Sequence, residues 1–534
     1  MLLDLQRTLF EKSPDRSTLL RYRPSAEKQY RVQVFRNHSF EFIAHMMGAY
    51  LDYARMGVDF CYSGYDDSFS FWKLDAAADL VLIWIDATRY HSASVQEFIN
   101  ERVEALRQRY LGPVLIVPYG AELSFLQSGV TVWNLTEVRG LLGTGVTEER
   151  TQSVTGTALS GDAMLAIAKT LGLRYFPALL QPPMKAIVVD FDNTLYEGVL
   201  GEDGIENLRL TEGHRRLQRK LREFSQQGLF LCAVTKNDPA DIQALLRART
   251  DFPLQADCFT KIAASWGEKS AAMLEIEQFL HIGTESILFI DDNIGELTAM
   301  EAAFPRIGLL QAMDNADLTY EILSNYPRLF KVNKTAEDSV RRVDIIAEAD
   351  RETMRRALSR EDFLRSLEVR LTFEIQNPAQ AIRISELANK TNQFIFNYKR
   401  YKQAEIEQMF CSPSYVVVTA SLSDRLSDSG LIGVCVGKQE ADYVLLEECF
   451  ISCRALGRGI EDVIVCMAIR NILQCAQRSK LLVCFQEGPR NQPAETFVNT
   501  HLADFLERPA EFTYEISEDL LQIQIHNYFQ RERE

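Results

Sequence analysis

The stretch that most constrains the fold is KAIVVDFDNTLYEGVLGEDG, residues 185 to 204. Four apolar residues lead into Asp190, Asp192 and Thr194 with the spacing D-x-D-x-T, which predicts a buried strand ending in two carboxylates. Ligands bind α/β sheets at the carboxyl ends of the strands. Asp190 is therefore placed to attack a phosphorus atom and to bind a divalent cation, with Asp192 as the acid for the leaving group. The alternative is an ordinary strand followed by an acidic turn.

Three later segments offer partners for a phosphate. In LFLCAVTKND an apolar strand (229 to 234) ends in Thr235, whose hydroxyl and following backbone N–H groups suit phosphate oxygens. In ASWGEKSAAM, Lys269 begins a helical pattern, where its ammonium would neutralise charge that develops between nucleophile and phosphate. In SILFIDDNIGE an apolar strand ends in Asp291 and Asp292, two hard oxygen donors for a Mg²⁺ ion.

The four segments together resemble the haloacid dehalogenase (HAD) superfamily of phosphatases and phosphotransferases. The resemblance implies a Mg²⁺ ion held by Asp190, by the backbone carbonyl of Asp192 and by one acidic residue of the last motif. We expect Asp292 to bind the metal directly and Asp291 to pair with Lys269. The implied roles are a nucleophile at Asp190, an acid/base at Asp192, a phosphate ligand at Thr235, charge stabilisation at Lys269, and substrate contacts at Thr194, Lys236 and Asn237.

The spacing between these motifs leaves little room for a lid. Only about forty residues separate Asp192 from Thr235, and about thirty separate Thr235 from Lys269. A large cap domain does not fit in either interval. We therefore expect a phosphate site that is open to a bulky or protein-tethered substrate, or one that another domain closes.

Length and composition fit a multidomain enzyme. The chain has 534 residues, which is roughly three domains at ~150 residues each. A net charge of −16 argues against nucleic acid as the main partner. We expect no membrane association and a cytoplasmic location, because no uninterrupted apolar stretch approaches ~20 residues and the first residues lack a signal-peptide pattern. The ten cysteines form no C-x-x-C pair.

Two stretches mark the expected domain boundaries. One is LLQPPMK, and the other is the charged segment 334 to 360, which reads as a solvated helical connector. The sequence thus predicts an α/β protein of three domains. They are a flavodoxin- or SGNH-like parallel sheet (1–180), a capless HAD Rossmann-like domain (183–330) and a mixed α/β domain (340–534).

The first domain alternates strand and helix patterns, which predicts a parallel, doubly wound sheet. It resembles the SGNH-hydrolase-like domain, with RNHSF (36 to 40) where a nucleophilic serine loop would follow the first strand. No histidine occurs between His91 and His214, so a late histidine base is missing. We therefore interpret Ser39 as structural or ligand-contacting, and the domain as a degenerate docking module.

The last domain contains a strand, a glycine turn and a long amphipathic helix in CFISCRALGRGIEDVIVCMAIRNIL (449 to 473). Backbone N–H groups of the turn R-x-x-G-x-G, which spans Arg454, Gly457 and Gly459, suit a pyrophosphate or a phosphopantetheine arm. The motif is short and matches ordinary strand-to-helix turns as well. Its place after LLEECFISC resembles a GNAT-type acyltransferase fold.

In this order the three domains resemble the FkbH-like family, from Met1 to about residue 500. That family makes glyceryl thioesters on acyl carrier proteins from 1,3-bisphosphoglycerate, which implies an acyl carrier protein and an acyl phosphate as partners. The motif NKTNQF implies substrate contacts at Asn392 and Gln393. Departures from the commoner family pattern leave the identity of the acyl group open: Phe191, Tyr196, Glu197, Val234, Thr235, Ile294 and Gly295.

A thioester route needs a thiolate, and Cys453 is the predicted nucleophile. It ends a strand before the glycine turn, where a following helix N-terminus would lower its pKa. The alternative is a small buried hydrophobe, as we expect for Cys449. Carrier docking is expected at Lys399, Arg400 and Lys402, or at the basic helix 214 to 222, although both are also consistent with solvated faces.

Two further functions remain open from the sequence. A plain Mg²⁺-dependent phosphohydrolase with a carrier-binding module would need the carboxylates but no cysteine. A CoA-dependent acyltransferase, for instance one acting in surface-polysaccharide synthesis, would bind CoA at Arg454 to Gly459. A scaffold without catalytic activity fits least, because the phosphatase residues are all present.

Overall fold

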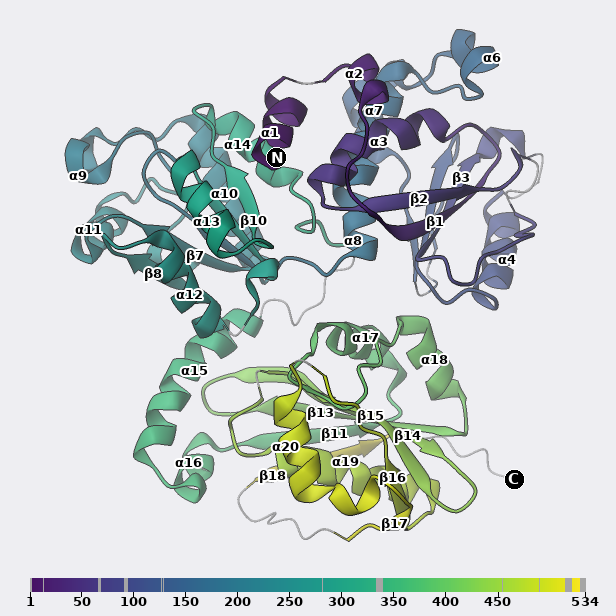
Figure 1. Ribbon diagram of the computed structural model, residues 1–534, viewed down its shortest axis with the longest axis vertical. Coiled ribbons are helices and arrows are strands. Elements are labelled where there is room, and N and C mark those ends of the chain that lie inside the picture. The colour runs from purple at the N-terminus through teal and green to yellow at the C-terminus, as the bar shows by residue number, and fades with distance from the viewer. Residues whose placement is uncertain are drawn as a thin grey trace. The chain divides into compact units, whose positions relative to one another are not determined.

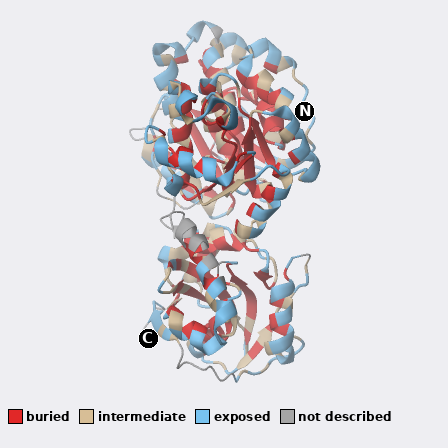
Figure 2. Ribbon diagram, turned by 90° about the vertical axis from the view of Figure 1, so that its left-hand side faces the viewer, coloured by how far each residue is buried: buried red, intermediate tan, exposed pale blue. Residues whose placement is uncertain are grey.

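The computed structural model describes the chain except residues 1, 13, 66–68, 91–94, 126, 128, 281, 333–339, 454, 489, 514–520 and 529–534. The chain divides into two compact units, Met1–Lys334 and Thr335–Glu534. The first unit contains two separate five-stranded sheets and the second contains one larger sheet (Figure 1). Figure 2 shows that the buried residues lie along these sheets. The predicted α/β class is confirmed.

The first sheet is entirely parallel and has the order β2-β1-β3-β4-β5. Its central strand β3 is LVLIWID, and all seven residues are buried, as expected for a strand covered on both faces. The elements are β1 (Lys28–Arg36), α3 (Glu41–Tyr53), β2 (Gly57–Tyr62), β3 (Leu80–Asp86), α4 (Val95–Arg107), β4 (Val114–Tyr119), β5 (Val130–Val132) and α7 (Gly161–Thr170).

The second sheet is also parallel, with the order β10-β9-β6-β7-β8. Side chains cap its helices: Thr211 accepts the N–H of His214 at the start of α10, and Asn293 accepts the N–H of Gly295 at the start of α13. The elements are β6 (Ala186–Val189), α10 (Glu212–Gln226), β7 (Phe230–Thr235), α11 (Pro239–Ala248), β8 (Lys261–Ala264), α12 (Lys269–Leu280), β9 (Ile287–Asp291), α13 (Ile294–Ala303), β10 (Gly308–Gln311) and α14 (Ala316–Ser324).

The sheet of the second unit is mixed, with the order β17-β16-β15-β14-β13-β11-β18, and β12 pairs with β15 off this path. Apolar residues of α19 join one core cluster on this sheet, and those of α17 and α18 join another. The elements are β11 (Arg370–Ile375), α17 (Ala381–Lys390), β12 (Phe394–Ile395), α18 (Gln403–Cys411), β13 (Tyr415–Ser423), β14 (Asp428–Gln439), β15 (Val444–Ile451), α19 (Glu461–Ala476), β16 (Lys480–Val483), α20 (Gln492–His501), β17 (Ala510–Glu511) and β18 (Gln522–Asn527).

One helical stretch among the described residues, Gly161–Leu180, has the length and composition that could cross a membrane. More than half of its most apolar window, 56%, is buried inside the protein. Helices of a protein core meet the same criteria, so this stretch is weak evidence for a span.

The predicted solvated connector is a helix, α15 (Val340–Ala357), but it is not only a connector. Its Asp344 and Arg351 belong to a cluster of four buried charged residues completed by Asp424 and Arg458, with side chains 0–2% exposed. Arg351 binds Asp424 through two nitrogens, at 2.9 and 3.1 Å. Arg458 donates to Asp424 at 2.9 Å and to Asp344 at 3.1 Å. The cluster therefore ties α15 to the loop before β14 and to the glycine turn.

Replacing Asp424 by Ala is expected to lower the free energy of unfolding of the second unit by about 3–5 kcal/mol. The reason is that two buried guanidinium groups would then share the one buried carboxylate of Asp344, with the partly exposed Glu348 as the second partner of Arg351. Chemical denaturation followed by a probe in the second unit measures the loss. Asp442, whose side chain is 69% exposed, is the matched control. Its alanine variant should change stability by less than about 0.5 kcal/mol. Equal stability of both variants would show that the cluster does not hold the unit together.

Candidate active site

Neighbouring strands of the second sheet bring the predicted phosphate residues to one edge. β6 lies between β7 and β9, and all three are parallel, so their carboxyl ends lie side by side. Asp190 follows β6 directly, Thr235 ends β7 and Asp291 ends β9. The backbone N–H of Asp190 donates to the carbonyl of Ile290, which fixes the end of β6 against β9. Lys269 is the first residue of α12.

Lys269 lies between two of the carboxylates. Its Nζ is 2.8 Å from Asp190 Oδ2 and 2.7 Å from Asp291 Oδ2. Asp190, Asp291 and Asp292 each offer one oxygen atom, and these atoms lie within 4.8 Å of one another. Three ionised carboxylates and one ammonium leave two negative charges, which one divalent cation balances.

The site fits Mg²⁺. Asp190 Oδ1 and Thr194 Oγ1 are buried and have no hydrogen-bond partner, so both are available to a metal ion or a phosphate. Burial raises the pKa of Asp190 to about 6, opposed by Lys269 and reinforced by Asp291. Burial likewise raises the pKa values of Asp291 and Asp292. Burial disfavours the ionised forms of these clustered carboxylates, and a hard divalent cation bound between them would stabilise those ionised forms.

Mg²⁺ is expected to stabilise the protein more at about pH 8 than at about pH 5. The pKa of Asp190 is about 6 in the folded chain and ordinarily 3.8, so the folded state holds more protons between these values. Ionisation of this buried carboxyl therefore lowers the free energy of unfolding as the pH rises, and this loss of stability is complete above about pH 6. Mg²⁺ binds the ionised carboxylate and so offsets this loss of stability. Thermal denaturation with Mg²⁺ and with a chelator measures the difference at each pH, and an equal shift at both values would contradict the assignment.

Asp192 lies outside the three-carboxylate group. Its Oδ1 accepts the Tyr196 hydroxyl at 2.6 Å and the Leu200 N–H at 3.0 Å, and its Oδ2 accepts Asn237 Nδ2 at 2.8 Å. Asn237 Nδ2 also lies 2.9 Å from Thr235 Oγ1. The side chain of Asp192 is thus held by neutral donors, which leaves its backbone carbonyl for the predicted metal contact.

The side chain of Lys236 is engaged elsewhere. Its Nζ lies 2.6 Å from Glu296 Oε1, and the lysine side chain is 44% exposed. A contribution of Lys236 to phosphate binding therefore comes from its backbone N–H, as the position after Thr235 predicts. No local sequence pattern indicates the partner Glu296, which lies in the first turn of α13.

No cap domain is inserted between the motifs. Residues 193–229 and 236–268 are all described, and the largest elements they contain are α10 and α11. Two exposed apolar side chains follow strand ends at this edge: Trp266, which is 70% exposed, and Ile294, which is 45% exposed.

The residues predicted for acyl transfer share one end of two paired strands in the second unit. β12 pairs with β15 through Phe394 and Ile451. Asn392 and Gln393 precede β12 and Cys453 follows β15, so all three lie at the same end of the ladder. Cys453 is exposed, as are Asn392 and Gln393. Asn392 Oδ1 accepts Arg400 Nη2 at 2.7 Å.

Cys453 follows the end of β15 and precedes the glycine turn, as predicted. α19 begins at Glu461, eight residues after Cys453 (461 − 453), and the glycine turn lies between them. Arg454, the first residue of that turn, lies outside the described residues. The effect of the helix N-terminus on this thiol stays a prediction.

Other residues of the chain already form hydrogen bonds with the backbone of the glycine turn. Gly457 and Gly459 have φ values of +81° and +71°, which side-chain-bearing residues rarely adopt. The N–H of Gly457, predicted to bind a phosphate, donates to Glu461 Oε1 at 2.6 Å. Arg355 Nη1 donates to the Gly457 carbonyl at 2.7 Å, and Arg360 donates to the Gly459 carbonyl.

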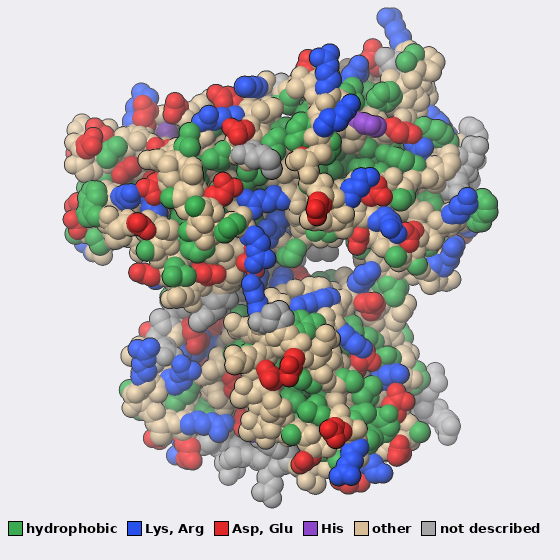
Figure 3. All heavy atoms as spheres, viewed as in Figure 1, with side chains coloured by type: hydrophobic (Ala, Val, Ile, Leu, Met, Phe, Trp, Pro, Cys, Tyr) green, Lys and Arg blue, Asp and Glu red, His purple; other side chains and the backbone are tan. Residues whose placement is uncertain are grey.

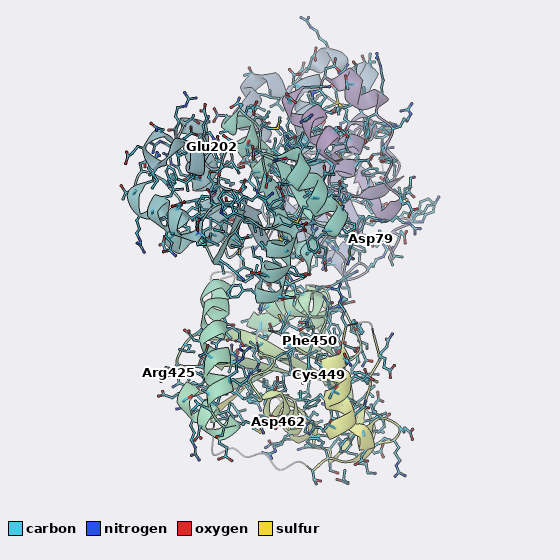
Figure 4. The ribbon with its side chains drawn as sticks, turned by 60° about the vertical axis from the view of Figure 1, so that its left-hand side comes forward. Asp79, Glu202, Arg425, Cys449, Phe450 and Asp462 are labelled. Atoms are coloured by element: carbon cyan, nitrogen blue, oxygen red, sulfur yellow. The ribbon has the colours of Figure 1, made fainter. Side chains whose placement is uncertain are left out.

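Cys449 is a packing residue, as expected. It is fully buried, burial raises its pKa well above the ordinary value, and its Sγ lies 3.0 Å from that of Cys435 on the paired strand β14. Figure 4 shows Cys449 and Phe450 within the sheet of the second unit.

Ser39 in the first sheet lacks a catalytic base among the described residues. Its Oγ donates to Glu41 Oε2 at 2.8 Å. Burial would raise the pKa of Glu41, but hydrogen bonds from Arg36, the backbone and Ser39 lower it to about 2. Nδ1 of the adjacent His38 lies 3.0 Å from Thr157 Oγ1. The interpretation of Ser39 as structural or ligand-contacting stays a prediction.

The predicted docking surfaces are largely charge-paired. Lys399 pairs with Glu447, and Arg400 Nη1 donates to the Thr391 carbonyl at 2.6 Å. On the face in Figure 3, basic and acidic side chains are mixed over most of the surface. Four of the five basic side chains of α10 form ion pairs: Arg215–Asp251, Arg216–Asp317, Arg219–Glu212 and Lys220–Glu223.

No protein-family profile matches this chain, and no curated protein matches it. Among solved structures, the chain is similar to the N-terminal part of the protein BF1531 from Bacteroides fragilis, which contains a phosphatase domain and is complexed with Mg. The identity is 15%, the TM-score 0.47, and the match covers 62% of this chain and 99% of that one.

Two further solved structures match parts of the chain. One is the ribosomal-protein-alanine N-acetyltransferase from Brucella melitensis biovar Abortus 2308, with 11% identity, a TM-score of 0.20, and coverage of 27% of this chain and 98% of that one. The other is a HAD family enzyme from Bacteroides thetaiotaomicron complexed with magnesium and inorganic phosphate, with 13% identity, a TM-score of 0.16, and coverage of 33% and 79%.

Proposed function

We propose that the first unit is a HAD-type, Mg²⁺-dependent phosphohydrolase or phosphotransferase and that the second unit transfers an acyl group. The proposed substrate is a phosphorylated acyl phosphate such as 1,3-bisphosphoglycerate, and the proposed acceptor is the phosphopantetheine thiol of an acyl carrier protein. The observation that carries the proposal is the position of Lys269 between Asp190 and Asp291, with Asp292 completing a group of three carboxylates.

The phosphatase half uses two aspartates in different roles. The Asp190 carboxylate attacks phosphorus, the bond from phosphorus to the ester oxygen breaks, and Asp192 gives a proton to the departing alkoxide. Water then attacks the aspartyl phosphate, Asp192 takes the water proton, and inorganic phosphate leaves. Lys269 stabilises the charge on the transferring group. A bound Mg²⁺ would supply further charge neutralisation between nucleophile and phosphate.

The acyl-transfer half starts from an activated group. An acyl phosphate has a good leaving group, so the thiolate of Cys453 can attack the acyl carbon, form a thioester and expel inorganic phosphate. The carrier thiol then attacks this thioester and releases the cysteine thiolate. The exposure of Cys453, and the polar side chains of Asn392 and Gln393 at the same strand ends, support this assignment.

The CoA-dependent alternative has less support. The Gly457 N–H already donates to Glu461, so one of the proposed phosphate contacts is taken. On one edge of β15, residues 444–446 pair with β16 and residues 450–451 pair with β12. Only the short stretch 447–449 between these two ladders is left for a pantetheine arm to pair with. A phosphohydrolase with a carrier-binding module remains the second candidate, because the carboxylate site is independent of Cys453.

Intact-protein mass spectrometry tests the proposal after incubation with 1,3-bisphosphoglycerate and Mg²⁺, with and without an acyl carrier protein. We expect a glyceryl adduct on the enzyme in the absence of the carrier and a glyceryl thioester on the carrier in its presence. Phosphate release without either adduct would favour the plain phosphohydrolase. Neither phosphate release nor an adduct would contradict the proposal as a whole.

A further inference from the structure

Asp190 and Asp192 carry the same side chain two residues apart, yet the structure holds them in different ways. Asp190 pairs with the cationic Lys269 and shares the three-carboxylate group. Asp192 is outside that group and is held by uncharged donors, two of them side chains, Tyr196 and Asn237. The difference between the two aspartates therefore lies in their hydrogen-bond partners.

The position of the Tyr196 hydroxyl is itself fixed. The side chain is fully buried, and its ring stacks on Phe252 with centroids 5.8 Å apart. The guanidinium of Arg249 covers Phe252 at 4.4 Å and donates to the Leu208 carbonyl at 2.8 Å. The hydroxyl therefore reaches Asp192 Oδ1, at 2.6 Å, from a rigid support.

Asn237 holds the other oxygen and connects it to the phosphate ligand. Its Nδ2 lies 2.8 Å from Asp192 Oδ2 and 2.9 Å from Thr235 Oγ1, and the asparagine is 2% exposed. One amide group thus sets the position of the acid/base relative to a residue that binds the phosphate.

We propose that Tyr196 and Asn237 are positioning residues that hold the Asp192 carboxylate away from the metal group and toward the leaving-group oxygen. The proposal rests on the proposed phosphatase function. Asp192 lies two residues from Asp190, and its carboxylate would be attracted to the ammonium of Lys269 and to a bound divalent cation; two fixed donors oppose a rotation of the carboxylate toward them. Without them, Asp192 would become an additional ligand of the cation and would be lost as the acid/base.

The test is Tyr196→Phe, which removes one hydroxyl and little volume. With a small phosphate monoester as the substrate, we expect kcat to fall about tenfold, as for the loss of one charge-assisted hydrogen bond. KM should stay unchanged, and the Mg²⁺ concentration for half-maximal activity should stay the same or fall. In the background of Asp192→Asn, the same substitution should have no further effect.

The matched control is Tyr53→Phe, since Tyr53 is also buried and its hydroxyl has no hydrogen-bond partner. It should leave kcat unchanged. A Tyr196→Phe variant with unaltered kcat, or one that loses the same factor with and without Asp192, overturns the inference. Failure of the unsubstituted protein to release phosphate at all would instead overturn the proposed function.

Discussion

Replacing Asp190 by Asn should abolish phosphate release, with a loss of about 10³-fold or more. The substitution removes the nucleophile and one charge of the metal group while it changes the side-chain volume very little. Because the carboxyl is buried beside Asp291, its neutral replacement should not lower the thermal stability of the metal-free protein. Release of inorganic phosphate, and Tm measured in the presence of a chelator, check the two parts.

The control for this variant is Asp241→Asn, which changes an exposed carboxylate of α11 in the same sheet domain. It should retain full activity. Turnover of the Asp190 variant at the rate of the unsubstituted protein would show that another group attacks the phosphate, and the assignment of the whole site would then fail.

The Cys453→Ser variant should lose the enzyme adduct and carrier loading together, each by at least about a hundredfold, while phosphate release from a small monoester is retained. A hydroxyl is nearly isosteric with the thiol but far less ionised at neutral pH, so it cannot capture the acyl group at a useful rate. The carboxylate site uses none of the same residues. Mass spectrometry of enzyme and carrier, run beside a phosphate assay, measures both activities.

Cys411→Ser is the matched control, because Cys411 is also exposed and belongs to the same unit. It should load the carrier at the normal rate. If the Cys453 variant does so as well, the acyl group passes directly from the acyl phosphate to the carrier thiol or through another residue, and the role assigned to Cys453 is wrong.

The phosphate residues could be located from the sequence because each follows or begins a regular element. Apolar runs before Asp190 and Asp291 predicted strands, and strands that lie side by side in a parallel sheet must place their ends together. The expected pairing of Asp291 with Lys269 is present at 2.7 Å. The local apolar pattern and the geometry of a parallel sheet were therefore sufficient to predict which residues meet at the carboxylate site.

Contacts between distant side chains could not be predicted in the same way. Nothing in the local sequence shows that Asn237 binds Asp192, or that the Gln6 amide pairs with the backbone of Gln311, 305 residues away. The buried partners of Arg351 were missed because a helix rich in charge reads as solvated. The side chain of Glu461, which accepts the Gly457 N–H of the glycine turn, could not be predicted either, because the turn itself has no regular pattern.

The most direct test of the central claim is the dependence of phosphate release on Mg²⁺, measured with 1,3-bisphosphoglycerate and with a simple phosphate monoester. We predict release that saturates with Mg²⁺, that stops when a chelator is added, and that is absent in the Asp190→Asn variant. Release at the same rate with a chelator present, or no release from either substrate at any Mg²⁺ concentration, would contradict the assignment of Asp190, Asp291, Asp292 and Lys269 as a magnesium-dependent phosphoryl-transfer site.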